Sequence, residues 1–339
     1  MTSKLLLAAD IGGTKSDFAL FECDMSCSVP LLQKKYINAD FSGIEDVVAC
    51  FLAECDRTPA AACLALAGII SGDHVCMTNL PWQTDCSSLR QRFGFSRVLL
   101  INDLTALCSS LPLLGSSDLL EVQKANGAFG EIKGVLAPGT GLGEGLLVTL
   151  KSQQLACGCE GGHTDFAPLD KEQIALLTWM QKKEKPVSYE MLIAGPGLVN
   201  LYEFCRDYHR IPESSTIVHN MTRAAGDVTP VIIDGALSDP CCPLCRHVLE
   251  LFLSILGSEA GNLALKVYAT GGIYLGGGIL SRIAEKISYK GFLENFCRKG
   301  QMADLLASIP VHVILKRDAA LIGAARFGHD EFFKSNDNG

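Results

Sequence analysis

Three glycine-rich segments, each placed after an apolar run, constrain the fold of this chain most strongly. They are Asp10-Ile11-Gly12-Gly13-Thr14, Pro138-Gly139-Thr140-Gly141-Leu142-Gly143 and Gly276-Gly277-Gly278. Glycine lets the backbone approach a ligand closely and turn its amide groups toward it. Several such turns in one chain predict a phosphorylated ligand held in a cleft between two lobes.

The composition favours a compact protein of two domains. The chain has 339 residues, of which 48% are hydrophobic and 19% charged, enough for a sizeable core. The net charge of -8 argues against a nucleic-acid partner, since phosphate backbones call for basic surfaces. We find no stretch long and apolar enough to span a bilayer and no signal-peptide pattern at Met1–Asp10. We therefore predict a cytoplasmic protein with no membrane partner.

The cysteines are numerous but do not form a metal-binding pattern. There are fifteen, and without a signal peptide they are expected to be reduced and mostly buried. Cys241-Cys242-Pro243-Leu244-Cys245 has one half of a zinc-type spacing, but no second pair stands nearby to complete four ligands. The sequence favours ordinary cysteines at the start of a helix, and we assign no metal-ligating residue.

The apolar pattern alternates between strands and helices along the chain. Strands are predicted at Lys4–Asp10, Lys15–Phe21, Lys34–Asn38, Ala61–Ala67, Val98–Ile101, Gly134–Ala137, Gly145–Leu150, Gln154–Ala156, Ile273–Leu275 and Val311–Leu315. Helices are predicted at Ile44–Cys55, Ser87–Phe93, Asp103–Ser110, Lys171–Lys182, Tyr189–Ile193, Leu198–Tyr208, Pro243–Leu265 and Ala319–Phe327.

Both halves of the chain repeat one arrangement. Each has strands joined by a glycine turn, followed by alternating strands and helices. This fits a duplicated α/β unit closing over a cleft. A Ser-, Gly- and Pro-rich run at Ser109–Asp118 marks the boundary. We predict a small α/β domain of residues 1–113, completed by residues 313–339, and a large α/β domain of residues 114–312.

The first glycine turn is a candidate phosphate loop. Its amide groups and the Thr14 hydroxyl can donate hydrogen bonds, whereas the Asp10 carboxylate only accepts them. Asp10 would therefore need a cation, most simply hydrated Mg²⁺, between itself and a phosphate. Strand-like sequence follows the turn, unlike the helix that follows a dinucleotide fingerprint or a Walker loop. Gly139-Thr140-Gly141 takes the corresponding place in the second half. The alternative for both is an ordinary hairpin turn.

A second group of polar residues is suited to sugar hydroxyls. Asn102 ends a strand and Asp103 opens a helix, at the edge of an α/β sheet where ligands usually lie. Glu160 and His163 stand around a Gly-Gly turn. Carboxylates and amides accept and donate in the bidentate geometry that vicinal hydroxyls present. The alternatives are a helix cap for Asp103 and a structural role for His163.

These motifs resemble the bacterial glucokinases, a family of the actin-like, hexokinase and heat-shock-protein ATPase superfamily. The resemblance covers nearly the whole chain. Its most specific parts are Glu160–Pro168, which has the pattern Glu-Gly-Gly-His-x-Asp-Phe-Ala-Pro, and Gly195–Tyr202, which is Gly-Pro-Gly-Leu-Val-Asn-Leu-Tyr. It implies a two-domain ribonuclease H-like (actin-like ATPase) fold with a ligand cleft between the lobes. It also implies ATP-dependent phosphorylation of the glucose 6-hydroxyl, the first step of glycolysis, by a homodimer.

The resemblance assigns a role to each motif. Asp103 matches the catalytic base. Sugar-binding positions are matched by Asn79, Asn102, Asp103, Glu160, His163 and Glu190, with Gly141 approaching the sugar through its backbone. The local sequence around Glu190 does not by itself indicate this role. ATP and Mg²⁺ are implied as cofactors, and the phosphate and nucleoside loops match Ala9, Asp10, Ile11, Gly12, Gly13, Thr14, Gly139, Thr140, Gly276, Gly277 and Gly278.

The chain departs from the family pattern at three positions. Ala9 and Pro138 stand where glycine or a glycine-like residue is usual, and Lys15 replaces a common asparagine. The cysteine-rich zinc motif of the related ROK sugar kinases is absent from the sequence, which favours the metal-free glucokinase branch. Two alternatives stay open: a kinase for another hexose or with another phosphate donor, and a non-catalytic sugar sensor.

Overall fold

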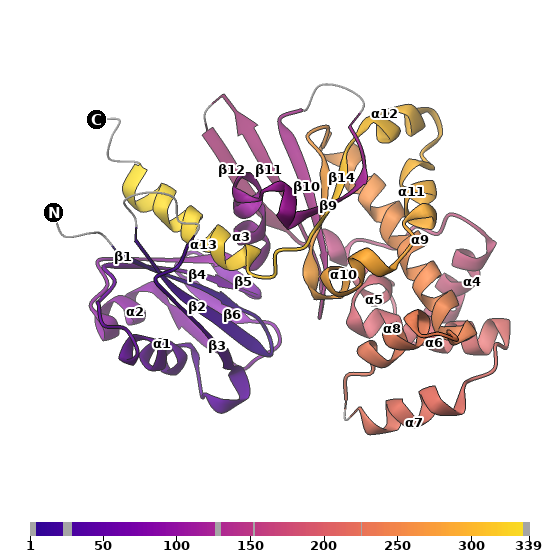
Figure 1. The fold of residues 1–339 in the computed structure, drawn as a ribbon, viewed down its shortest axis with the longest axis horizontal. Coiled ribbons are helices and arrows are strands. Elements are labelled where there is room, and N and C mark those ends of the chain that lie inside the picture. The colour runs from indigo at the N-terminus through magenta and orange to yellow at the C-terminus, as the bar shows by residue number, and fades with distance from the viewer. Residues whose placement is uncertain (1–4, 23–28, 126–129, 152, 225, 335–339) are drawn as a thin grey trace. The chain divides into compact units, whose positions relative to one another are not determined.

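The computed structural model describes residues 5–22, 29–125, 130–151, 153–224 and 226–334, drawn in Figure 1. They form two compact units. Unit 1 comprises Met1–Asp118, Gly145–Gly158 and Lys316–Gly339, and unit 2 comprises Leu119–Glu144 and Cys159–Leu315. The domain limits given above from the sequence stay a prediction.

Unit 1 is built on a five-stranded sheet with the order β3-β2-β1-β4-β8. The predicted hairpin is confirmed, since β1 (Leu5–Ile11) pairs antiparallel with β2 (Lys15–Glu22), and β3 (Leu32–Ile37) continues it. On the other side of β1, β4 (Ala61–Leu66) and β8 (Arg97–Asn102) run parallel to it. The carboxyl ends of three parallel strands therefore share one edge of the sheet.

Helices cover both faces of this sheet (Figure 1). Alternate residues of a strand point to opposite faces. Leu5 and Leu7 therefore pack with α1 (Ile44–Ala53) and α2 (Cys86–Phe93), whereas Leu6 packs with α3 (Asp103–Ser110) and α13 (Ala319–His329). Because both faces are buried, β1 is apolar almost throughout. The limits of α3 are those predicted from the sequence.

Unit 1 also contains elements that the sequence pattern did not predict. A small antiparallel sheet joins β5 (Gly68–Ser71), β6 (His74–Met77) and β7 (Gln83–Asp85). These strands have three or four residues each, too few for an alternating pattern to stand out. Short 3₁₀ turns occupy Asn38–Asp40, Leu111–Leu113 and Ser116–Asp118, and a π-helical turn follows α13 at Asp330–Lys334.

A six-stranded sheet has the order β12-β11-β10-β13-β14-β9. Strand β13 runs parallel to both β10 and β14, and β9 runs antiparallel to β14. All the strands predicted here are confirmed, and β9, which follows directly on the predicted boundary run, is additional. The bounds are β9 Leu119–Gln123, β10 Ile132–Pro138, β11 Leu142–Leu150, β12 Gln153–Cys159, β13 Ile273–Leu275 and β14 Val311–Ile314.

The rest of unit 2 is mainly helical. Its core surrounds α9, and the α9 glycine Gly257 lies so close to the Phe292 carbonyl that a Cβ there would overlap it. Helices α7, α8, α10, α11 and α12 were not predicted. The bounds are α4 Lys171–Met180, α5 Glu190–Ile193, α6 Gly195–His209, α7 Ser215–Arg223, α8 Thr229–Leu237, α9 Pro243–Lys266, α10 Gly277–Ile283, α11 Lys290–Cys297 and α12 Ala303–Ser308, with 3₁₀ turns at Gly161–His163, Ala284–Lys286 and Gly300–Met302.

Helix α9 corrects one expectation. By length and composition it could cross a membrane, although no such stretch was expected from the sequence. The most apolar window of the helix is 78% buried inside the protein. A helix surrounded by a core is apolar on all sides, so burial accounts for its composition and the resemblance to a membrane span is weak evidence.

Candidate functional site

The first glycine turn lies between β1 and β2 and is held by a buried asparagine. The Gly12 N–H donates to the Lys15 carbonyl at 3.0 Å, which closes the turn. Asn38 is 1% exposed; its side-chain amide donates to the Gly12 carbonyl at 2.8 Å, and its backbone N–H donates to the Thr14 carbonyl at 3.0 Å. The Ser16 hydroxyl completes the set by donating to Asn38 Oδ1 at 2.6 Å. Sequence reasoning missed Asn38, because only the β2–β3 register brings it to this turn.

The sheet of unit 1 brings Asp10 and the pair Asn102-Asp103 to one edge. In the parallel register Ile11 lies beside Leu66, and Leu66 lies beside Asn102. The row Ile11, Leu66 and Asn102 marks the carboxyl ends of the three parallel strands. Asp10 comes one residue before this row in the chain, and Asp103 comes one residue after it. The two carboxylates are close enough for the charge of Asp103 to raise the pKa of Asp10. The predicted placement of these polar groups at the mouth of an α/β sheet agrees with this arrangement.

Asp10 carries a strongly perturbed carboxyl group. Burial raises its pKa to about 7, and the charges of Asp103 and Asp17 add to the effect while Lys35 opposes it. In the folded protein the group holds its proton to a higher pH than in the unfolded chain, where the pKa is near 4. Ionising Asp10 without a bound cation is therefore unfavourable.

This shift predicts a loss of stability with rising pH that depends on Asp10. The folded state binds the extra proton between about pH 4 and pH 7, so the free energy of unfolding falls across that window as the pH rises. Relative to the wild type, Asp10→Asn should therefore gain about 3 kcal/mol between pH 4 and pH 7, at about 1.4 kcal/mol for each unit by which the pKa is raised. Urea unfolding of the ligand-free proteins from pH 4 to pH 8 measures the difference. Parallel curves for the two proteins would contradict the assignment.

Asn102 is the N-cap of α3, and Asp103 is the acidic residue of its first turn. Asn102 Oδ1 and Asp103 Oδ1 each accept from the Leu104 N–H, at 2.9 Å in both cases. The structural role considered for Asp103 from the sequence is therefore present as that of a first-turn acid, and Asn102 supplies the cap. These hydrogen bonds keep the two side chains at the sheet edge. Gly158 packs against Asn102, where a Cβ would overlap Asn102 Oδ1, and the Gly158 N–H donates to the Thr105 hydroxyl at 2.9 Å.

Asn79 lies against the glycine turn. A Cβ on Gly13 would be 3.1 Å from the Asn79 Cβ, and the Asn79 residue is exposed. Unit 1 thus brings together the hairpin turn, Asn79, Asn102 and Asp103. These are the predicted phosphate loop and three of the predicted sugar contacts, one of which, Asp103, is also the predicted base.

Unit 2 brings the other two glycine segments together. Gly139 donates its N–H to the Gly141 carbonyl at 2.8 Å, which closes the turn between β10 and β11. The Gly276 N–H donates to the Leu136 carbonyl at 2.7 Å, next to that turn. Gly277 has φ of 83°, and a Cβ there would overlap the Pro138 carbonyl oxygen. Glycine is thus required at Gly277 by both backbone conformation and close approach.

The predicted sugar residues of unit 2 form one cluster. His163 Nδ1 lies 3.6 Å from Glu160 Oε2, and His163 Nε2 lies 3.6 Å from Glu190 Oε1. The other Glu190 oxygen, Oε2, accepts from the Leu142 N–H at 2.8 Å. A Cβ on Gly141 would lie 2.6 Å from that same oxygen. Glu190 therefore links the Gly139–Gly141 turn to His163.

Backbone bonds hold Glu190 beside the Glu160 turn. The Tyr189 N–H donates to the Thr164 carbonyl at 3.1 Å, and the Phe166 N–H donates to the Val187 carbonyl at 2.9 Å. Glu160 and His163 are 75% and 62% exposed, so their polar atoms are accessible to a ligand. The only local sign of Glu190 in the sequence is an acidic residue at the start of a helix. Its role depends on this long-range pairing.

Glu144 is a further residue that sequence reasoning missed. It is 1% exposed, and a Cβ on Gly161 would overlap its carboxylate, so it lies directly behind the Glu160 turn. Burial raises its pKa to about 7, with a smaller contribution from Glu259. Among the residues that the structure describes, Glu144 Oε1 has no hydrogen-bond partner. No polar pattern in the sequence distinguishes it from the exposed acids.

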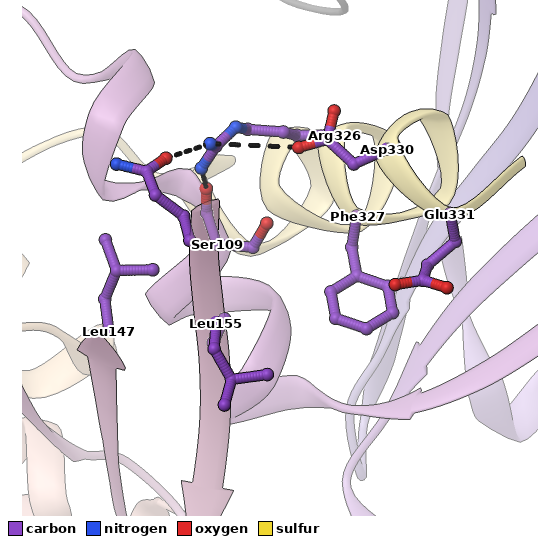
Figure 2. A pocket seen from close by; sticks show the side chains of 9 residues that line it. Ser109, Leu147, Leu155, Arg326, Phe327, Asp330 and Glu331 are labelled. Atoms are coloured by element: carbon purple, nitrogen blue, oxygen red, sulfur yellow. Dashed lines mark hydrogen bonds and ion pairs between the residues drawn. The ribbon is translucent and has the colours of Figure 1, made fainter. Parts of the chain in front are cut away.

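A small hollow in unit 1 lies apart from these residues. Figure 2 shows it beside Arg326, which donates to the Ser109 carbonyl at 2.6 Å and also bonds the Gln154 side chain. Its volume is about 70 Å³, far below the several hundred Å³ of a typical small-molecule site. None of the predicted site residues lines it, so we do not assign it to the site.

The cysteines do not add to the site. Thirteen cysteines lie in the described part of the chain, and three of them, Cys76, Cys157 and Cys159, are exposed. The expectation of mostly buried cysteines is thus only partly met. The described cysteines form no disulfide in the structure.

The fold and the two groups of residues define a sugar kinase of the actin-like ATPase class. A glucokinase from an Antarctic psychrotroph has the same fold, with a TM-score of 0.80 and 30% identity, covering 96% of this chain and 99% of that one. A Balamuthia mandrillaris glucokinase in complex with glucose has a TM-score of 0.76 at 22% identity, covering 96% and 94%.

Sequence comparison identifies the family within this class. The Glucokinase family model matches residues 7–331. Glucokinases of Nostoc punctiforme and Yersinia enterocolitica are each 36% identical, over 95% and 96% of this chain and 98% and 97% of theirs. The chain belongs to the glucokinase family. The resemblance and the fold class inferred from the motifs are confirmed.

Proposed function

We propose that this chain transfers the γ-phosphoryl group of ATP to the 6-hydroxyl of D-glucose. The observation that supports this most is the placement of Asp103 beside Asp10 at the carboxyl edge of the unit 1 sheet. This placement puts a carboxylate that can accept the proton of a hydroxyl next to a glycine turn suited to phosphates. Family membership supports the choice of reaction.

In the proposed reaction Asp103 is the base that receives the sugar proton. Its carboxylate orients the 6-hydroxyl in line with the γ-phosphorus and accepts the proton as the new O–P bond forms. The bond between the γ-phosphorus and the bridging oxygen breaks, and ADP leaves with the electron pair. Such transfer depends on positioning and charge neutralisation more than on a strong base, which suits an aspartate.

The glycine turns are proposed to bind ATP. The amide groups of Gly12, Gly13 and Thr14 and of Gly139 and Thr140 would donate to phosphate oxygens, and Gly276–Gly278 would contact the nucleoside. Asp10 suits a hydrated Mg²⁺, because a nearby cation would offset the burial and the acidic neighbours that disfavour its ionised form. When bound, Mg²⁺ neutralises phosphate charge.

Glucose is proposed to bind through the carboxylates, amides and imidazole of the two groups. The proposed partners of its hydroxyls are Asn79, Asn102, Glu160, His163 and Glu190. Gly141 would approach through its backbone, since Glu190 already occupies the space of a side chain there. Bidentate contacts with vicinal hydroxyls would favour the hexose whose hydroxyls match them.

A coupled assay of glucose 6-phosphate formation with Mg²⁺ and ATP tests the proposal. We expect turnover of glucose to exceed that of mannose, fructose and N-acetylglucosamine. Activity on another sugar alone would keep the reaction and change the substrate. Glucose binding without turnover of any sugar would instead favour a sensor.

Glu190→Ala should weaken glucose binding. The variant leaves the Leu142 N–H and His163 without their carboxylate partner. Because hydrogen bonds to charged groups contribute about 1.5–3 kcal/mol, we expect KM for glucose to rise about 10- to 100-fold. Glu190→Gln keeps an acceptor for Leu142 and should lose less, and the exposed Glu184→Ala is the matched control. An unchanged KM in Glu190→Ala would remove this residue from the site.

We also propose a cytoplasmic homodimer acting at the first step of glycolysis. The family relationship supports this assignment. Light scattering at micromolar protein measures the oligomeric state, and a clean monomer would contradict it.

A further inference from the structure

Two histidines and a glutamate from three helices meet on unit 2, apart from the residues assigned to the reaction. Glu172 is the second residue of α4, His209 is the last residue of α6, and His247 lies near the start of α9. Both imidazole Nε2 atoms lie 2.7 Å from the same oxygen, Glu172 Oε1. The three atoms all lie within 4.8 Å of one another.

The surrounding helices hold these side chains on a rigid support. The Gln173 side-chain amide donates to the Ser254 hydroxyl at 3.3 Å and so ties α4 to α9. Trp179 of α4 packs edge-on against Phe204 of α6, with ring centroids 6.0 Å apart. The imidazole rings of His209 and His247 are 4.9 Å apart and inclined at 79°. Sites carried on packed helices are better defined than sites on loops.

The cluster is also open to ions in solution. The side chains of Glu172, His209 and His247 are 30%, 32% and 33% exposed. The ion pairs of Glu172 within the described part of the chain are with the two histidines, not with a lysine or arginine. Within that part of the chain, no lysine or arginine thus competes for this carboxylate.

We propose that Glu172, His209 and His247 bind one divalent transition-metal ion of the Zn²⁺ type. Two imidazoles and a carboxylate are a known donor set for Zn²⁺, with a water molecule in the fourth position. Bonds of about 2.0–2.2 Å in a tetrahedral ion place donors about 3.4 Å apart. The two 2.7 Å separations between nitrogen and oxygen need to open by less than about 1 Å, which rotations of three partly exposed side chains supply. The ion would cross-link α4, α6 and α9.

Calorimetric titration of the chelator-treated, reduced protein with Zn²⁺ and with Ni²⁺ tests this site. We expect one equivalent to bind. Replacing a residue that only hydrogen-bonds a metal ligand weakens metal affinity about 10- to 100-fold. His209→Gln and His247→Gln each remove a ligand itself, so they should weaken metal binding by at least about a hundredfold. His219→Gln, at an exposed histidine of α7, is the matched control and should bind as the wild type does.

Three further measurements distinguish loss of the metal ligands from misfolding and from binding to cysteines. Kinase activity and circular dichroism of the variants report folding, because none of the three residues belongs to the proposed active site. The Co²⁺ spectrum distinguishes nitrogen and oxygen donors from cysteine thiolates. One-equivalent binding that survives in His209→Gln and His247→Gln, a thiolate spectrum, or the absence of binding in the folded wild type would each overturn the proposal.

Discussion

Replacing Asp103 with asparagine should lower kcat for glucose phosphorylation by about 10²–10⁴-fold, the range that a general base contributes. Asparagine has nearly the same shape but cannot accept the proton of the 6-hydroxyl. Its side-chain oxygen can still accept from the Leu104 N–H, as Asp103 does, so the start of α3 is preserved. KM for glucose and ATP should change much less than kcat.

The matched control for this variant is Asp85→Asn. Asp85 caps α2 in the same unit, and its carboxylate accepts from the Ser88 N–H at 2.9 Å, but it is not among the predicted site residues. Steady-state kinetics and urea unfolding should be measured on both variants. Asp103→Asn with substantial turnover would refute the assignment, and an equal loss in Asp85→Asn would attribute the effect to capping.

Replacing Gly323 with alanine should destabilise unit 1 by about 2–3 kcal/mol, the scale of overpacking a well-packed core. Gly323 lies on α13, and its Cα faces the backbone of α3. A Cβ would overlap the Ala106 carbonyl oxygen and lie 3.0 Å from the Ser110 N. A backbone carbonyl cannot rotate away as a flexible side chain does, so one of the helices must shift.

The comparison for Gly323→Ala is Gly291→Ala, on a helix of unit 2. Nothing lies within 4 Å of a Cβ at Gly291, so alanine should leave stability unchanged or raise it by up to about 1 kcal/mol. Urea unfolding gives both values. Because α3 begins at Asp103, we also expect Gly323→Ala to lower kcat. Equal stability of the two variants would contradict the close approach of α3 and α13.

Local elements were largely predictable from the sequence. The limits of α3 follow from the acidic residue at its start and the proline after Leu111. The β1–β2 hairpin follows from two apolar runs around Gly12-Gly13. The short strands β5 to β7 and the helices α7 and α8 were not found, because short or weakly patterned segments acquire their structure from packing.

The candidate site shows the same division. Ala9–Thr14, Asn102, Asp103 and the later glycine segments stand out in the sequence, since their residue types are unusual at the ends of apolar runs. Asn38 and Glu144 do not, because an isolated polar residue carries no sign of its burial. Glu190 entered only through the family resemblance, and its bond to the Leu142 N–H depends on the Thr164–Tyr189 pairing.

The amino-acid sequence was sufficient to predict the glycine turns, the family of the chain and most strands of the two larger sheets. These follow from residues that are neighbours along the chain, where periodicity, caps and turn chemistry act. Which side chains meet is seen only in the folded protein. Glu172, His209 and His247 are 37 and 38 residues apart in turn, and their meeting depends on the packing of three helices, which no local pattern encodes.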